Sequence, residues 1–140
     1  MSLPDFALSV REPWCWAILN PVIHKDIENR SWPTKFCGRV LLHAGKRYDP
    51  EGALWMRSQG IIAPGPDALV LGAYVGIVTI TCCWRYQDAS PANRSRLFAT
   101  GPYCFELKEA LPLPAARKGP GRLGIYRWRD MPKEGEKEVR

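Results

Sequence analysis

The sequence lacks the patterns that mark several common protein classes. None of its five cysteines forms a Cys-x-x-Cys pair, and its two histidines do not have zinc-finger spacing, so no structural metal site is expected. The odd number of cysteines provides no disulfide framework and indicates reduced thiols. The longest apolar stretch, around residues 69–80, contains Gly72 and Gly76 and is too short to span a bilayer as a helix.

The first ten residues also lack a cationic region followed by an apolar run, so no secretory signal is visible. Together with the reduced cysteines, this predicts a cytoplasmic protein that does not associate with membranes. No motif indicates a cofactor, and no internal repeat is present. A length of 140 residues with 46% hydrophobic residues fits one domain with a well-formed core.

Positive charge, proline and glycine are abundant. Lysine and arginine number 20 against 14 acidic residues, which gives a net charge of +6. This excess mildly favours anionic partners such as nucleic acid. Thirteen prolines and twelve glycines predict short elements joined by frequent turns.

The apolar pattern predicts a mainly β fold with two helices. Strands are expected at residues 6–10, 40–44, 73–84, 104–107 and 123–128, and helices at residues 14–19 and from residue 50 to near residue 60. Pro13 is expected at the first position of the first helix, and Asp49 as the cap of the second. Residues 87–101 are expected to form a polar loop. In the strand at 73–84, alternation predicts one shared face for Tyr74, Val78, Ile80, Cys82 and Trp84.

Several segments together resemble a known family. The stretches ALSVREPWCWAIL, KDIENRSWPT, GRVLLHAGK, GAYVGIV and GPYCFEL are similar to the ASCH family, named for activating-signal cointegrator homology, within the PUA-like superfamily. The chain looks like a stand-alone, bacterial-type member, and the similarity covers residues 7–126. Of the family signature G-x-K-x-x-E-x-R, the chain has Lys25, Glu28 and Arg30, whereas Ile23 stands at the glycine position.

The resemblance implies a small β-barrel of five to six strands with the two flanking helices. Residues 1–129 would form this domain. The charge-rich composition of residues 130–140 separately predicts a frayed tail. The signature would line a cleft between the first helix and the barrel. The family is regarded as binding RNA or other nucleic acid. One bacterial branch removes the acetyl group from N4-acetylcytidine, and it has threonine where this chain has Glu28.

The segment HKDIENRSW supports two interpretations. In a strand from residue 27 to residue 32, Glu28, Arg30 and Trp32 would share one face. In the first interpretation, Glu28 and Arg30 form a solvated pair worth about 0–1 kcal/mol. In the second, Glu28 orients Arg30 and Lys25 toward a groove, where they meet phosphate or a base edge while Trp32 or Trp14 stacks on the base.

Further candidates for nucleic-acid contact are spread along the chain. Ser9 and Arg11 lie where the first strand ends, His43 lies in an apolar strand as a core residue or a cleft ligand, and Lys46 follows that strand. Trp14 is the better cleft candidate of the two tryptophans on the first helix, and Tyr103 is a weaker one. A basic cluster near the C-terminus either follows a phosphate backbone or forms a solvated basic face; it comprises Arg117, Lys118, Arg122, Arg127 and Arg129.

Three functions are compatible with these patterns. The first is a binding module for RNA or a modified nucleotide, with DNA as a further possibility. The second is a small hydrolase acting on RNA or a modified nucleoside, in which Lys25 and Glu28 would be catalytic. The third is a protein-binding adaptor. The sequence does not indicate an oligomeric state.

Overall fold

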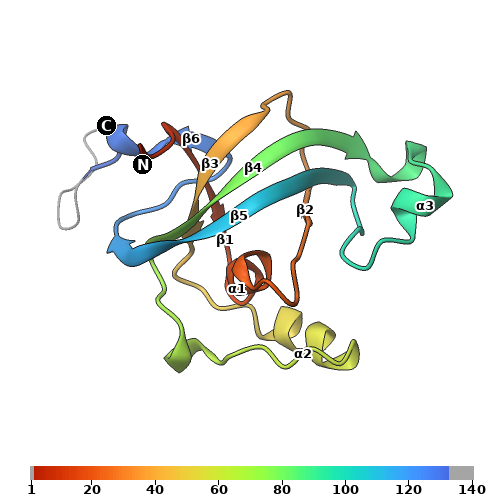
Figure 1. Cartoon of the computed structure of the whole chain (residues 1–140), viewed down its shortest axis with the longest axis horizontal. Helices are drawn as coiled ribbons and strands as arrows, with labels where there is room; N and C mark the ends of the chain where they lie inside the picture. Colours follow the sequence, from red (N-terminus) through yellow and green to blue (C-terminus); the bar gives the residue numbers. More distant parts are fainter. Residues whose placement is uncertain (1, 133–140) are drawn as a thin grey trace.

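The structure, a computed structural model, describes residues 2–132, and six strands form one mixed sheet in it (Figure 1). The strand order is β2-β5-β4-β3-β1-β6, and β1 and β3 are parallel whereas the other neighbours are antiparallel. The strands are β1 (Phe6–Val10), β2 (Ile27–Arg30), β3 (Gly38–Ala44), β4 (Ala73–Arg85), β5 (Tyr103–Lys118) and β6 (Ile125–Arg127). The helices are α1 (Trp14–Leu19), α2 (Pro50–Ser58) and α3 (Pro91–Arg94), with 3-10 turns η1 (Pro66–Ala68), η2 (Tyr86–Asp88) and η3 (Trp128–Asp130).

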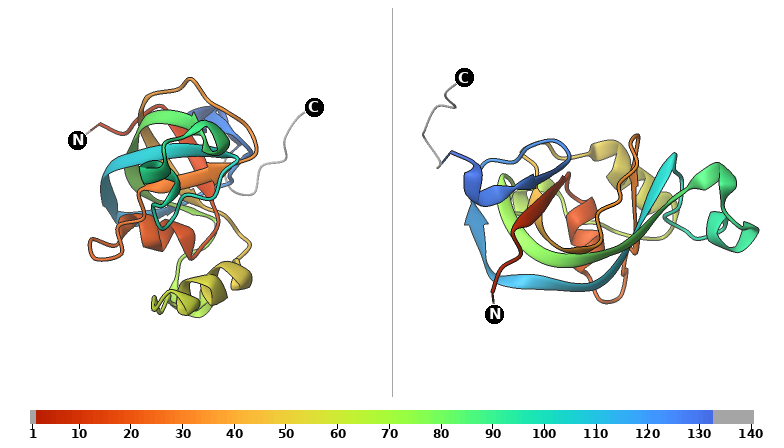
Figure 2. Two further views of the ribbon diagram at one scale, coloured as in Figure 1. Left: turned by 90° about the vertical axis from the view of Figure 1, so that its right-hand side faces the viewer. Right: turned by 90° about the horizontal axis from the view of Figure 1, so that it is seen from above.

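The mainly β architecture is confirmed, but the sheet is not a closed barrel. It curls around its core (Figure 2), and β2 and β6 remain its two edges within residues 2–132. Both edge strands are short, with four and three residues. Helix α1 packs against β3 and β5, so a helix rather than a further strand covers the inner face.

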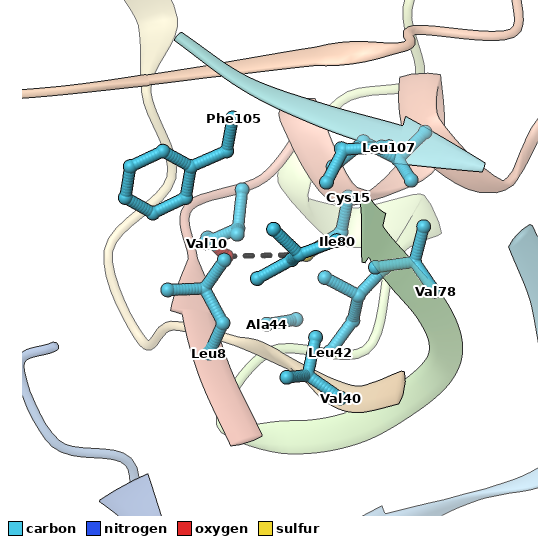
Figure 3. Packing of buried hydrophobic residues seen from close by; sticks show 11 residues of the cluster. Leu8, Val10, Cys15, Val40, Leu42, Ala44, Val78, Ile80, Phe105 and Leu107 are labelled. Carbon is cyan, nitrogen blue, oxygen red and sulfur yellow. Dashed lines mark hydrogen bonds between the residues drawn. The ribbon is translucent and has the colours of Figure 1, made fainter. Parts of the chain in front are cut away.

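The main core lies between the curled sheet and α1. Leu8, Val40, Leu42 and Phe105 from the strands pack there with Cys15 of α1 (Figure 3). The alternation of β3 is therefore as expected, with every second residue facing this cluster. Within the described part of the chain, none of the helices has the length and apolarity needed to cross a membrane.

Bulges overturn the expected single face of the strand at 73–84. The register against β5 shifts between Tyr74 and Gly76 and again between Ile80 and Cys82. As a result, Tyr74 packs in a different cluster from Val78 and Ile80. Each extra residue at a bulge reverses the alternation. Every second residue along the strand therefore no longer points to the same face once a bulge has been passed.

Three local predictions need correction. Strand β5 runs for 16 residues instead of ending at residue 107, because its exposed, proline-containing second half continues to pair with β4. Helix α3 occupies part of the expected loop at 87–101, and Ser90 caps it by accepting a hydrogen bond from the backbone N–H of Asn93. Pro13 is the cap residue of α1 and not its first helical residue. Most of the predicted tail lies outside the described residues.

Candidate functional site

A cavity of about 330 Å³ opens between α1, α2, β2 and the segment that precedes β5. We call it the aromatic pocket, and it is lined by Trp14, Lys25, Glu28, Asn29, Trp55, Phe98 and Thr100. The ring centroids of Trp14 and Trp55 are 5.8 Å apart, and those of Trp55 and Phe98 are also 5.8 Å apart. This volume is at the lower end of the range for small-molecule sites, about 300–1,000 Å³. The walls therefore suit one flat, compact ligand group.

A buried group of three charges supports one side of the pocket. The Glu28 carboxylate accepts hydrogen bonds from Lys25 Nζ at 2.7 Å and from Arg30 Nε at 3.0 Å, one on each oxygen. Lys25 Nζ also donates to the Ile27 carbonyl. The side chains of Lys25, Glu28 and Arg30 are only 3%, 10% and 18% exposed, respectively. A solvated surface pair therefore does not describe this segment.

Local hydrogen bonds bring Lys25 to the pocket. The side chain of Asn20, just after α1, accepts hydrogen bonds from the backbone N–H groups of Val22 and Ile23. The backbone N–H of Lys25 then donates to the Ala17 carbonyl at 2.9 Å, so the chain turns back along α1. Lys25 Nζ consequently lies 5.6 Å from the centre of the Trp14 ring. A cation at this distance is attracted by the face of the indole.

The electrostatics favour an ionised Glu28. Burial acts to raise the pKa of Glu28, but the charges and hydrogen bonds of Lys25 and Arg30 outweigh it, so the pKa lies below its ordinary value. One carboxylate between two cations leaves a net charge of +1 among largely buried side chains. Hydrogen-bond acceptors and anions are therefore the ligand groups that this side of the pocket favours.

Asn29 holds the opposite wall in place. Its Nδ2 donates to the Phe98 carbonyl at 2.7 Å, and its Oδ1 accepts from the backbone N–H groups of Thr100 and Gly101 at 3.0 and 2.9 Å. These three bonds fix the segment that carries Phe98 and Thr100. Asn29 lies within the signature segment but is not among the site residues predicted from the sequence.

Trp14 is fixed between the two helices that flank the pocket. Its Nε1 donates to Asp49 Oδ2 at 2.8 Å, while Asp49 Oδ1 caps α2 by accepting from the N–H of Gly52 at 3.0 Å. Burial acts to raise the pKa of Asp49, but these hydrogen bonds and the charge of Arg11 lower it below its ordinary value. Arg11 forms an ion pair with Asp49 at 3.3 Å and is itself half exposed. A Cβ on Gly52 would lie 2.7 Å from Trp14 Nε1, so the helix approaches the indole closely.

Some of the candidates expected from the sequence lie beside the pocket without lining it. Arg30 lies behind Glu28, where its NH2 group donates to the Ser9 carbonyl at 2.6 Å. Trp32 packs edge-on against Phe105 with centroids 5.1 Å apart. Tyr103 pairs with Arg30 in the sheet and packs against the main core.

The side chains of Ser9 and His43 belong to a separate network. Ser9 Oγ lies 3.1 Å from His43 Nδ1 and 3.2 Å from the Tyr126 hydroxyl, and His43 Nε2 lies 2.8 Å from the Gly119 carbonyl. Burial, opposed by the bond to Gly119, lowers the pKa of His43. His43 therefore matches the expectation of a buried, hydrogen-bonded core residue rather than that of a cleft ligand. Lys46 is exposed and packs against Gly72, away from the aromatic pocket.

Trp55, Phe98 and Thr100 complete the pocket, and none of the three is among the site residues predicted from the sequence. Trp55 belongs to the expected second helix, but the apolar pattern of that helix did not show which part of the protein Trp55 would face. Phe98 and Thr100 lie in a segment expected to be a polar loop.

In comparisons with known proteins, no family model and no curated protein matched this chain.

Proposed function

We propose that the protein binds RNA or a modified nucleotide, with one base held in the aromatic pocket, as in an ASCH-type cleft of a PUA-like domain. The observation that carries this proposal is the combination of three aromatic side chains with a net cationic side in one cavity. A nucleobase has two apolar faces and a polar edge, and this pocket offers a surface for each. Stacking of one base on an aromatic side chain is worth about 1–3 kcal/mol.

Lys25 is the group best placed to contact the polar edge of the base. An ammonium group has three protons, and Lys25 directs hydrogen bonds to the Ile27 carbonyl and to Glu28. A third proton is left for a base carbonyl or a phosphate oxygen. Glu28 and Arg30 then act as positioning residues, because they hold Lys25 in place without lying over the base.

Hydrolysis is the alternative, and the geometry supports it less well. A general base needs a free lone pair directed at the substrate and a pKa near the working pH. Both oxygens of Glu28 accept hydrogen bonds from cations, and its pKa is lowered rather than raised. Lys25 is likewise engaged by two acceptors, which makes it a poor nucleophile. The protein is incubated with N4-acetylcytidine and with RNA. Turnover by the wild-type protein that is lost in Glu28→Gln, while circular dichroism shows that the variant is folded, would establish the alternative.

Binding is best tested by tryptophan fluorescence during titration with a single-stranded RNA of about 16 nucleotides, the upper end of typical single-strand site sizes. We expect Trp55→Ala to weaken binding by about 1–3 kcal/mol, the value of one stacked base. Trp16→Ala is the matched control, because Trp16 lies on α1 but lines a different cavity. Equal weakening in both variants, or no binding to the wild-type protein at low salt, would refute the proposal.

A further inference from the structure

A second cavity, of about 400 Å³, is lined by residues at the end of β5 and by residues near the described C-terminal end of the chain. The end of β5 lies at the left of Figure 1. We call this cavity the C-terminal groove. Its polar lining comes from Arg117 and Lys118 at the end of β5 and from Arg129 in η3, and its apolar lining includes Tyr74 and Trp128. Nothing in the proposed role of the aromatic pocket uses these residues.

Trp128 holds two guanidinium groups in the groove. The Cζ atoms of Arg117 and Arg129 lie 4.9 and 4.6 Å from the centre of the Trp128 ring. The ring itself is fixed, since it is only 9% exposed and its Nε1 donates to the Pro4 carbonyl at 2.7 Å. Tyr74 packs against it with centroids 5.7 Å apart. Guanidinium groups that are already ordered lose less conformational entropy when they bind a ligand.

The charge around the groove selects an anion. Among the residues that line the groove, three are basic, Arg117, Lys118 and Arg129, and none is acidic. Arg129 forms an ion pair with Asp5, and Lys118 Nζ donates to the Leu71 carbonyl at 3.1 Å. Arg117 has no ion pair with a carboxylate in the described part of the chain. A planar guanidinium matches two oxygens of a phosphate.

The same contacts argue for a phosphate rather than a base in this groove. Trp128 is buried under two guanidinium groups, so its face is not available for stacking on a nucleobase. In the groove, guanidinium groups cover the aromatic ring. In the aromatic pocket, by contrast, indole and phenyl side chains line the cavity themselves.

Strand β5 connects the two sites. It begins at Tyr103, which is paired with Arg30, and it ends at Lys118. At about 3.3 Å per residue, its 16 residues span at most about 50 Å. The two cavities share no lining residue, so a nucleotide that fills the aromatic pocket does not fill the groove, whereas an oligonucleotide is long enough to reach both.

We propose that the C-terminal groove binds backbone phosphates of the single-stranded nucleic acid whose base occupies the aromatic pocket. This inference rests on the proposed function. It assigns the polymer, rather than a free nucleotide, as the ligand. It also assigns Arg117 and Arg129 the role of phosphate contacts outside the aromatic pocket.

The test compares two double variants that each remove two positive charges. Arg117→Gln with Arg129→Gln alters the groove, and Lys35→Gln with Arg57→Gln alters exposed residues elsewhere. With a 16-nucleotide oligouridine, we expect the groove variant to bind about tenfold more weakly at low salt. For this variant, the slope of log affinity against log salt concentration should become shallower by about 1.4. Each lost phosphate contact on a single strand contributes about 0.7, and the variant loses two. Binding of uridine monophosphate should be the same as in the control variant.

A second measurement uses the unaltered protein and does not depend on the folding of a variant. The indole N–H resonance of Trp128 should shift in NMR spectra when the oligouridine is added, but not when uridine monophosphate is added. If Trp55→Ala weakens oligouridine binding while the groove variant matches its control and Trp128 does not shift, the groove proposal is wrong and the aromatic pocket stands. If the groove variant and Trp128 respond but Trp55→Ala does not, the aromatic pocket is wrong and the groove is a separate phosphate site, so the bridging proposal also fails.

Discussion

Replacing Glu28 with glutamine tests whether a buried carboxylate holds the cations of the aromatic pocket together. Glutamine keeps the shape of the side chain but removes its charge, and it can offer one carbonyl oxygen to only one of the two cations. Lys25, with 3% of its side chain exposed, would be left with a poorly compensated charge. Removing one partner of a buried ion pair costs about 3–5 kcal/mol. Since one acceptor is retained, we expect Glu28→Gln to lower the free energy of unfolding by about 3 kcal/mol.

The matched control is Asp88→Asn, because Arg85 and Asp88 have the same sequence spacing as Lys25 and Glu28. Arg85 and Asp88 lie 3.9 Å apart, and their side chains are 52% and 65% exposed. An exposed pair contributes about 0–1 kcal/mol, so the control should change stability very little. Urea unfolding followed by circular dichroism measures both differences. A loss below about 1 kcal/mol in Glu28→Gln would show that this carboxylate is solvated and would refute the reasoning.

The pH dependence of the same difference gives an independent check. The pKa of Glu28 in the folded protein lies below its ordinary value of 4.5. Ionised Glu28 therefore contributes its full stability above the unfolded pKa, and this contribution is lost as the pH falls through the folded pKa. The gap between wild type and Glu28→Gln should be largest near neutral pH and should shrink below about pH 4.5. A gap that widens in acid would contradict the assigned direction.

Three further outcomes are expected. Asn29→Ala removes three hydrogen bonds to residues 98–101 and should destabilise the protein by about 2–4 kcal/mol, with faster amide exchange in that segment. Gly101→Ala should destabilise it by at least about 1 kcal/mol in urea unfolding, because φ is +78° and a Cβ there would lie 2.5 Å from Tyr86 Cβ. Burial and then the adjacent Glu106 raise the pKa of Cys82 to about 11, so iodoacetamide should label it slowly at neutral pH and faster in Glu106→Gln.

Strand and helix positions followed from local patterns where the pattern was regular. Strand β1 and helix α1 have the expected bounds, and Asp49 caps α2 as expected. The prediction failed where bulges reversed the alternation, as at Tyr74, and where an exposed, proline-containing segment continued as the second half of β5. In both cases pairing with a neighbouring strand decided the structure, and no short segment contains that information.

The candidate site was predictable from the sequence only where its residues lie close together in the chain. Lys25, Glu28 and Arg30 lie within six residues of one another, so a turn and a strand are enough to bring them together. The resemblance to ASCH proteins pointed to the same three residues. Ser9 and His43 were reasonable candidates by position in the chain, but their side chains face a different network.

The sequence by itself placed the three charged residues in one short segment and determined the capped helix α2 and the apolar alternation of β3, because a helix cap and the alternation along a strand are set by residues close in the chain. Only the tertiary structure decided that Trp55 and Phe98 would face Trp14 across a cavity. These three side chains come from segments about 40 residues apart, and their meeting depends on how the curled sheet places α1, α2 and the segment before β5. That placement arises from strand register and long-range packing, which are properties of the whole chain.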